Sequence, residues 1–398
     1  MMAAFGASLT PENKVILLEK NEKLGKKLYI TGKGRGNFTN TAETEVFFSK
    51  IMTNPRFLYS ALRRFSNQEL LRFMEEWGLS WKEERGGRVF PKSDHASDIT
   101  RTLEKALRNN QVEIRLNTSV SKLLARKQGS SPGEGTNAGE SGRAVCGVQL
   151  TSGQTLTADH VIVATGGVSY PATGSTGDGF RFAQELGLKV TELLPALVPF
   201  ETKESDIPGL QGLSLRNVVL KVFDPKKKIL FEDFGELLFT HFGVSGPLAL
   251  RASSVLTKRL AGGEALVASI DLKPAIPEKE LDERLVRHIA ENRRREFSHF
   301  FEGLLPGKLK NVAQERCAID SGQRIGDISK AQRKEILSLL KAFSFTIVGT
   351  RGFAEAIITQ GGVSVKELVP KSMRAKSIRG LSFAGEVIDV DALTGGYN

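Results

Sequence analysis

The sequence predicts an α/β fold that is interrupted by a β-rich insertion. Short apolar runs at 15–18 and 160–163 each end in a polar or glycine-rich turn, which is typical of buried strands, and the first run reads as a parallel strand. Segments 55–77 and 96–109 repeat their apolar residues with the period of a helix. From about 193 to 272 the pattern changes to short strands separated by turns. Together these observations predict a parallel sheet with helices packed on it, and a second domain built mainly from strands.

The stretch from Lys14 to Asn40 is the main indication of a ligand. Its apolar run ends at Glu19, and in a dinucleotide-binding fold a carboxylate at the end of the second strand binds the adenosine ribose. Glycines and basic residues then alternate, and such a backbone can form a nest for an anion. These residues are Gly25, Lys26, Lys27, Gly32, Lys33, Gly34, Arg35 and Gly36. An ordinary strand followed by a solvated basic loop explains the same pattern equally well.

The nucleotide-binding domain is expected to be truncated at both ends. The acidic residue of a dinucleotide-binding fold lies about 20 residues beyond its G-x-G-x-x-G turn. Counting back from Glu19 puts that turn at or before Met1, so we expect residues 1–8 to be the end of the first helix. The chain also stops directly after Gly395-Gly396-Tyr397-Asn398, where a helix would ordinarily begin.

Two further glycine-rich turns are candidate cofactor contacts. His160–Gly167 is an apolar strand that breaks into paired glycines, a junction that flavoproteins often place against their cofactor, although a simple tight turn is an equal alternative. Thr173–Gly179 opens into an amphipathic helix at 180–186, and glycine-rich backbone at a helix N-terminus readily binds anions. The second turn is not a Walker A motif, because no Gly-Lys-Ser/Thr follows it.

Four segments are predicted along the chain. Residues 1–192 and 344–398 would form the nucleotide-binding domain, 193–274 a β-rich insert, and 275–343 a helical part of that insert. Residues 128–143, rich in Gly, Ser and Glu, are predicted to form a loop between two strands. Further strands are predicted at 112–116, 145–150, 154–158, 218–223, 229–231, 237–240, 266–270, 344–348 and 354–359.

Composition limits the class of protein. The chain has 398 residues, 40% hydrophobic content and no apolar run long enough to span a bilayer or act as a signal peptide. Cys146 and Cys317 are too few for a disulfide framework, so a reducing cytoplasm is expected. The net charge of +11 fits an anionic ligand, a nucleic acid or a solvated surface. Because runs such as Arg293–Arg295 lack interleaved aromatics, a solvated surface is favoured over a nucleic-acid partner.

Side-chain catalysis is not indicated. The five histidines are scattered without an H-E-x-x-H pattern, and no G-x-S-x-G nucleophile motif occurs. No metal site is therefore expected, and we expect a bound cofactor to perform the chemistry on a small-molecule substrate. Three side chains are candidate proton donors, each with a structural role as the alternative: Tyr170, Asp178 and His241.

Four motifs, in order along nearly the whole chain, resemble one family. They are Leu18–Lys27 with Thr31–Asn40, Ala164–Gly179, Gly235–Pro247 and Phe383–Asn398. Jointly they are similar to the BaiN-like NAD(P)/FAD-dependent oxidoreductases, also called aminoacetone oxidase family FAD-binding enzymes. The resemblance implies a Rossmann-type FAD-binding domain of the two-dinucleotide-binding flavoprotein type, with an inserted β-barrel-like domain and a helical segment.

The resemblance also implies a set of cofactor contacts. Glu19 would bind the adenosine ribose and Lys20 would flank the adenine. The segment around Gly385 would approach the ribityl-phosphate region, and the last four residues the isoalloxazine. The remaining implied contacts are Lys27, Gly34, Arg35, Asn37, Thr39, Val120, Ala164, Thr165, Gly166, Glu386, Asp389, Gly395, Gly396, Tyr397 and Asn398.

The chain departs from the family pattern in ways that leave two functions open. Its expected truncation removes the first strand with its glycine turn and the last helix, and Gly36 stands where relatives usually have Cys. The first hypothesis is a FAD-dependent oxidoreductase that transfers a hydride from NAD(P)H to an organic acceptor. The second is a non-catalytic basic protein that binds nucleic acid or a protein partner and keeps a degenerate flavin site.

Overall fold

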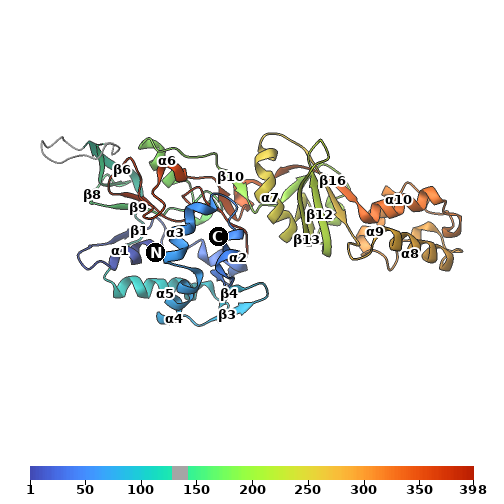
Figure 1. Ribbon diagram of the computed structural model, residues 1–398, viewed down its shortest axis with the longest axis horizontal. Helices are drawn as coiled ribbons and strands as arrows, with labels where there is room; N and C mark the ends of the chain where they lie inside the picture. Colours follow the sequence, from blue (N-terminus) through green and yellow to red (C-terminus); the bar gives the residue numbers. More distant parts are fainter. Residues whose placement is uncertain (128–141) are drawn as a thin grey trace. The chain divides into compact units, whose positions relative to one another are not determined.

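The computed structural model describes residues 1–127 and 142–398, which form two compact units (Figure 1). Unit 1 contains Met1–Pro195 and Phe353–Asn398, and unit 2 contains Ala196–Gly352. Unit 2 is thus inserted into the chain of unit 1. The loop predicted at 128–143 lies outside the described residues, apart from its last two.

Unit 1 contains two short parallel sheets. Strand β1 (Ile16–Leu18) pairs parallel with β5 (Glu113–Arg115), which confirms the parallel strand predicted at 15–18. Strand β9 (Val161–Val163) pairs parallel with β18 (Leu381–Phe383), which confirms the strand predicted at 160–163. The prediction that both strands are buried is wrong, however, because every residue of β1 is half-buried and Ile162 of β9 is 41% exposed. Each sheet has two strands in the described part of the chain, so each strand keeps an unpaired edge.

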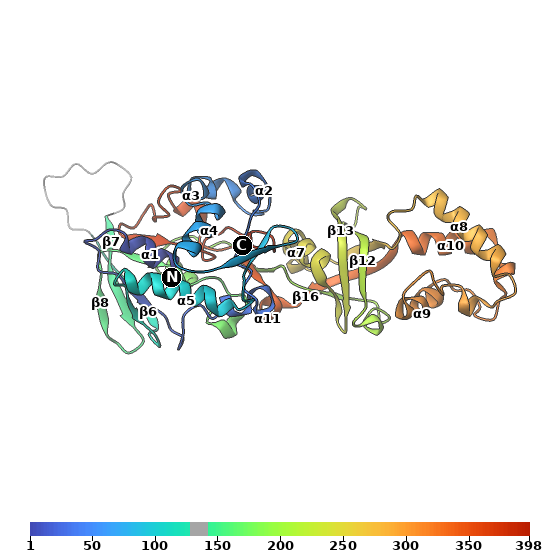
Figure 2. The same ribbon diagram turned by 90° about the horizontal axis from the view of Figure 1, so that it is seen from below.

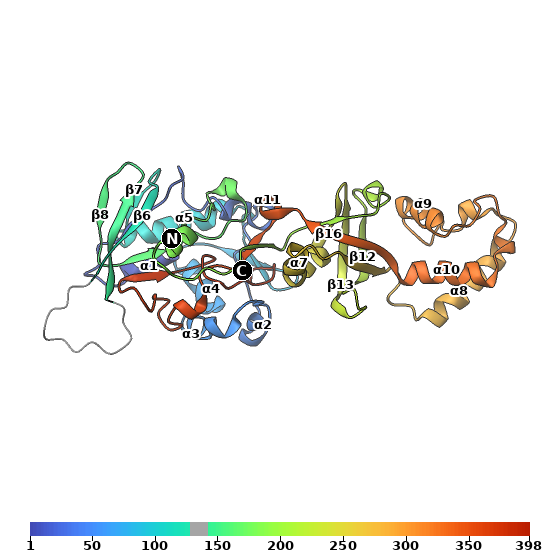
Figure 3. The ribbon, with the colours of Figure 1, turned by 90° about the horizontal axis from the view of Figure 1, so that it is seen from above.

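Antiparallel strands occupy other parts of unit 1. The predicted hairpin is confirmed, because β7 and β8 pair antiparallel and β6 lies on the other side of β7 (Figure 3). A second sheet has the order β2-β4-β3. The bounds are β2 (Thr39–Asn40), β3 (Trp81–Glu84), β4 (Arg88–Pro91), β6 (Val120–Lys127), β7 (Arg143–Leu150), β8 (Thr155–Thr157), β10 (Leu194–Ala196) and β17 (Ile358–Gln360).

The helix predicted at 96–109 is confirmed, whereas the one at 55–77 is broken. The first piece ends at Arg64, where Phe65 turns extended. Ser66 then caps the second piece, since its side chain accepts a hydrogen bond from the Glu69 N–H and the Glu69 carboxylate accepts one from the Ser66 N–H. This reciprocal cap starts a new helix inside a segment whose apolar residues repeat with an uninterrupted helical period. The helices are α1 (Met2–Ser8), α2 (Thr44–Ser49), α3 (Tyr59–Arg64), α4 (Asn67–Glu76), α5 (Ala96–Asn109), α6 (Asp178–Glu185) and α11 (Gly352–Glu355).

Unit 2 is built around a closed six-stranded barrel in the order β11-β14-β13-β12-β15-β16. Helix α7 (Gly246–Ala261) packs on the barrel, and α8 (Glu278–Glu291), α9 (Gly307–Arg316) and α10 (Lys330–Lys341) form the predicted helical part (Figure 2). Phe200, Leu220 and Phe239 are among its buried core residues. The strands are β11 (Phe200–Thr202), β12 (Ser214–Phe223), β13 (Ile229–Thr240), β14 (Gly243–Ser245), β15 (Leu266–Asp271) and β16 (Phe343–Thr350).

Three sequence predictions differ from this arrangement. The strands predicted at 229–231 and 237–240 are one continuous strand, β13, because both halves pair with β12. The chain leaves unit 2 at Gly352 and not near 344, since β16 pairs with β11 and β15 and so closes the barrel. The strand predicted at 354–359 is replaced by the short α11 and by β17.

Candidate functional site

Lys27 and Glu386 meet in a half-buried polar cluster of unit 1. The Lys27 Nζ donates to the Glu386 Oε2 at 2.8 Å and to the Ser169 Oγ at 2.6 Å. The Glu386 Oε1 accepts a hydrogen bond from the backbone N–H of Thr359 at 2.8 Å. Ser169 and Thr359 are fully buried, and the Glu386 side chain is 14% exposed. The cluster therefore joins three distant parts of the chain and satisfies both charged groups.

Glu19 and Lys20 lie against the glycine-rich loop that precedes α6. The Glu19 Oε1 accepts hydrogen bonds from the backbone and side-chain N–H groups of Asn21, whose side chain also donates to the Thr173 carbonyl. The Lys20 Nζ donates to the Asp178 carboxylate at 2.7 Å and to the Thr176 Oγ1 at 2.6 Å. Two motifs that are far apart in the sequence therefore form one surface.

The junction after β9 lies between these two groups. Gly166 has a φ of +73°, and a Cβ built on it would lie 3.6 Å from the Ser175 Oγ and 4.0 Å from the Glu386 Oε2. Thr165 abuts the first turn of α6, because a Cβ on Gly179 would lie 2.2 Å from its Oγ1. Ala164 to Gly166 thus lie beside both the glycine-rich loop and Glu386.

The last residues of the chain pack on β2. The Asn40 side chain donates to the Gly395 carbonyl at 2.9 Å, and a Cβ on Gly396 would lie only 2.1 Å from the carbonyl oxygen of Thr39. The Tyr397 ring contacts Phe47 edge-on, with 5.1 Å between ring centroids. The Asn398 Oδ1 accepts a hydrogen bond from the Ala392 N–H. Thr39 and the glycine pair, both implied cofactor contacts, therefore lie together.

Several implied contacts lie in other surroundings. Arg35 forms ion pairs with Glu84 and Asp94 and stacks on Phe90, an arrangement that holds its guanidinium against the β2-β4-β3 sheet. Lys82, and then Arg35, hold the pKa of Asp94 below its usual range. The Asn37 side chain donates to the carbonyls of Thr39 and Val89. Gly34 closes the turn before Arg35 with a φ of +86°, and Val120 pairs with Leu150 at the start of β6.

The three candidate proton donors lie in different local surroundings. Asp178 is bound by Lys20 at the start of α6. Tyr170 precedes the glycine-rich loop with a φ of +52°, and its N–H donates to the Phe353 carbonyl. His241 is exposed in the turn between β13 and β14, which belongs to unit 2.

Asp391 is a candidate site residue that the sequence analysis missed. It is 1% exposed, and neither carboxyl oxygen has a hydrogen-bond partner among the described residues. Burial, and then the Asp389 and Glu386 carboxylates, raise its pKa, while the nearby polar side chains of Thr53 and Gln360 oppose that rise. The available signal was an acid inside the apolar stretch 387–393, where a buried charge would need a partner.

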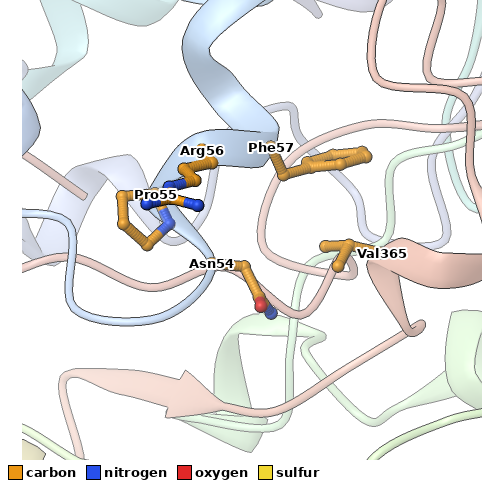
Figure 4. A pocket seen from close by; sticks show the side chains of 5 residues that line it. All are labelled: Asn54, Pro55, Arg56, Phe57 and Val365. Atoms are coloured by element: carbon orange, nitrogen blue, oxygen red, sulfur yellow. The ribbon is translucent and has the colours of Figure 1, made fainter.

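Asp389 lies beside a small pocket. The Asn54 side chain donates to the Asp389 carbonyl at 2.7 Å, and burial raises the pKa of the Asp389 carboxyl. A pocket of about 380 Å³ begins at Asn54, and Figure 4 shows the side chains around it. It is lined by Asn54, Pro55, Arg56, Phe57 and Val365. An amide, a guanidinium and three apolar side chains therefore adjoin the acidic segment.

Residues 1–127 and 142–398, which the structure describes, lack two kinds of feature. None of their helices combines the length and apolar character that crossing a bilayer requires. No group of three or more His, Cys, Asp or Glu side chains there could hold a metal ion.

A family model described as the HI0933-like protein Rossmann domain matches residues 1–398. The chain belongs to this family. It is 28% identical over 400 residues to a 3-dehydro-bile acid delta(4,6)-reductase of Clostridium scindens, covering 100% of this chain and 92% of the relative. It is 30% identical over 399 residues to a ribosomal RNA dihydrouridine synthase of Haemophilus influenzae, covering 100% of this chain and 90% of the relative.

The chain is also similar to a solved structure, the 3-ketosteroid delta1-dehydrogenase of Sterolibacterium denitrificans. It is 13% identical, with 99% of this chain and 94% of that chain covered and a TM-score of 0.49. The family match confirms the resemblance and the Rossmann-type FAD-binding fold class, and the barrel is the expected insert. The protein is a flavin-dependent oxidoreductase.

The residues present fit a flavin dinucleotide. Asp391 offers a buried carboxyl whose oxygens have no partner in the described chain, so it can bond to a ligand without losing an internal hydrogen bond. Gly166 and Gly396 both adopt left-handed conformations, where the missing Cβ lets backbone approach closely. Glu386 lies near Gly166, and its ion pair with Lys27 fixes both side chains.

Proposed function

We propose that this protein reduces a carbon–carbon double bond conjugated to a carbonyl group, with FAD as its cofactor and NAD(P)H as the electron donor. The convergence of Lys27, Gly166 and Glu386 from three distant segments is the observation on which the proposal rests. It brings together residues that the family resemblance assigns to the cofactor.

The names of the relatives support this reaction class. A delta(4,6)-reductase acts on double bonds of a 3-dehydro-bile acid, and dihydrouridine is uridine with its ring double bond saturated. Saturating a carbon–carbon double bond adds a hydride to one carbon and a proton to the other, and in this proposal NAD(P)H supplies the two electrons and is oxidised. Bound FAD supplies the two-electron hydride chemistry that side chains lack.

The chain's own residues bind and orient the cofactor in this proposal. Glu19 and Lys20 would hold the adenosine end, where Asn21 and Asp178 already fix their side chains. Lys27 would hold Glu386 in place from the opposite side of the cluster. Gly395 and Gly396, seated on β2, would form the wall beside the flavin ring. Because these groups come from different segments, correct folding of unit 1 assembles the site.

Ribosomal RNA is a second candidate substrate. The H. influenzae relative is named for it, and the net charge of +11 would favour a polyanion. The alternative hypothesis of a non-catalytic basic protein is also based on this charge, but it predicts that the protein binds no flavin. RNA binding that weakens steeply with salt, together with NAD(P)H oxidation that requires the RNA, would favour RNA over a small enone as the substrate.

The first test is the visible absorption spectrum of the purified protein before and after addition of FAD. A stoichiometric flavin band is expected, followed by NAD(P)H oxidation when a conjugated enone or a uridine-containing RNA is supplied. Lys27→Met should weaken FAD binding at least tenfold, because it leaves the Glu386 carboxylate buried without its ion pair.

Lys26→Met is the matched control. Lys26 forms an ion pair with the exposed Glu22 on the surface, so its loss should leave FAD binding unchanged. A wild-type protein that takes up no FAD would refute the proposal. Equal effects of the two lysine variants would show that the Lys27–Glu386 cluster does not hold the cofactor.

A further inference from the structure

Residues 46–65 of unit 1 combine positive charge with aromatic rings. The stretch contains no Asp or Glu, and its cations are Lys50, Arg56, Arg63 and Arg64. Aromatic residues alternate with these cations in the sequence, among them Phe57, Tyr59 and Phe65. The run Arg293–Arg295 lacks such interleaving, which is the pattern of a surface that binds single-stranded nucleic acid.

Tyr59 is the centre of the exposed part of this stretch. It is 46% exposed, and Phe65, which follows α3, is 43% exposed. The Arg63 guanidinium lies over the Tyr59 ring, 4.3 Å from its centroid. The Phe48 ring lies beside Tyr59, with 5.5 Å between the two centroids. Because unpaired bases stack both on aromatic rings and on guanidinium planes, this group offers a surface for a base.

The arginines around Tyr59 are available to an anion. Arg56, Arg63 and Arg64 are exposed, and none of them forms an ion pair within the described chain. The nearest acids in the sequence, Glu45 and Glu69, are fewer than the cations. Arg56 also borders the pocket of about 380 Å³ (Figure 4). The positive charge of this surface favours a partner that carries several phosphates.

The same stretch is attached to the C-terminal segment of the chain. Ile51 forms a bridge with Ala392. Phe47, the neighbour of Phe48 on α2, contacts the Tyr397 ring edge-on at 5.1 Å. Because the resemblance assigns the last four residues to the isoalloxazine, this surface adjoins the part of the proposed site where the substrate would be reduced.

We propose that residues 46–65 form a docking surface for a single-stranded segment of RNA. An unpaired base stacks on Tyr59 and Arg63, and the neighbouring arginines bind the flanking phosphates. The inference rests on the proposed function, because it gives the second candidate substrate a binding surface. An enzyme that acts on a base must reach it outside a duplex, so the substrate is an unpaired base and not a helix. A small enone without phosphates would gain nothing from the arginines.

The test measures binding of a fluorescently labelled oligouridine of about 12 nucleotides by anisotropy at several salt concentrations. Tyr59→Ala should weaken binding about tenfold because it removes the stacking ring, whereas Tyr59→Phe keeps the ring and should stay within about twofold of wild type. Arg56→Ala combined with Arg64→Ala should reduce the slope of log K against log salt by about 1.4, since each phosphate contact on a single strand contributes about 0.7.

Arg293→Ala combined with Arg294→Ala is the matched control, because it removes the same charge from two exposed arginines of unit 2. Its affinity and salt slope should equal those of wild type.

Three results would overturn the inference and leave the proposed function standing with a small enone as substrate. They are a wild-type protein that does not bind oligouridine, equal losses in the two double-arginine variants, and a Tyr59→Ala variant that loses binding to phosphatidylserine vesicles but not to oligouridine. The expected losses in a protein that takes up no FAD would support the docking surface and refute the proposed function.

Discussion

Replacing Gly396 by alanine tests whether the last residues lie on β2 as the structure shows. Gly396 has a φ of +92°, and the new Cβ would lie 2.1 Å from the oxygen and 2.3 Å from the carbon of the Thr39 carbonyl. Both atoms belong to backbone that pairs with β4, so they cannot turn aside as a flexible side chain could. Gly187 is the matched control, because it has a φ of +80° and nothing within 4 Å of its missing Cβ.

The two substitutions should differ only in the steric clash between the new Cβ at position 396 and the Thr39 carbonyl. An alanine in the left-handed region costs about 1–2 kcal/mol, which is the whole expected effect of Gly187→Ala. Overpacking adds about 1–3 kcal/mol, so Gly396→Ala should reduce the free energy of unfolding by about 2–5 kcal/mol in total. Movement of residues 395–398 away from β2 would reduce this loss at the expense of the Asn40 and Phe47 contacts.

Urea unfolding followed by tryptophan fluorescence measures this effect within one unit. Both tryptophans, Trp77 and Trp81, belong to unit 1, so unfolding of unit 2 does not contribute directly to the signal. A lower midpoint with an unchanged m-value is expected for both variants, and the larger shift for Gly396→Ala. Equal shifts would refute the reasoning, since they would mean that Gly396 does not approach the Thr39 carbonyl.

Two further predictions concern ionisable side chains. Because the pKa of Asp391 is raised in the folded state, the folded protein binds that proton more tightly, and wild type should lose stability as pH rises above the ordinary carboxyl pKa of about 4. Asp391→Asn should lose less stability between pH 5 and pH 8 in urea unfolding, and an unchanged pH slope would contradict this. Cys317 is 3% exposed, and burial, then Glu335, raises the pKa of its thiol to about 12. In a Cys146→Ser background it should therefore resist a thiol reagent at pH 8 until unit 2 unfolds, and rapid labelling of the folded protein would contradict its burial.

The candidate site could be predicted from the sequence only in part. Glycine-rich turns and the acid at Glu19 marked segments that could bind an anion, and the resemblance added Lys27 and Glu386. No local pattern shows that these two side chains pair with each other, because they lie at opposite ends of the chain. Asp391 shows the same limit, since burial and missing partners are properties of the folded environment and not of an aspartate in an apolar stretch.

The sequence by itself determined most of the elements. Helix α5 and strands β9 and β15 follow from local apolar periodicity, which reflects how each segment presents one face to a core. Tertiary structure decided how they combine: β9 pairs with β18 across the whole insertion, β16 closes the barrel, and β1 stays half-buried beside a single partner. Such pairings depend on contacts between distant residues, whose free energy is gained only once the intervening chain has folded.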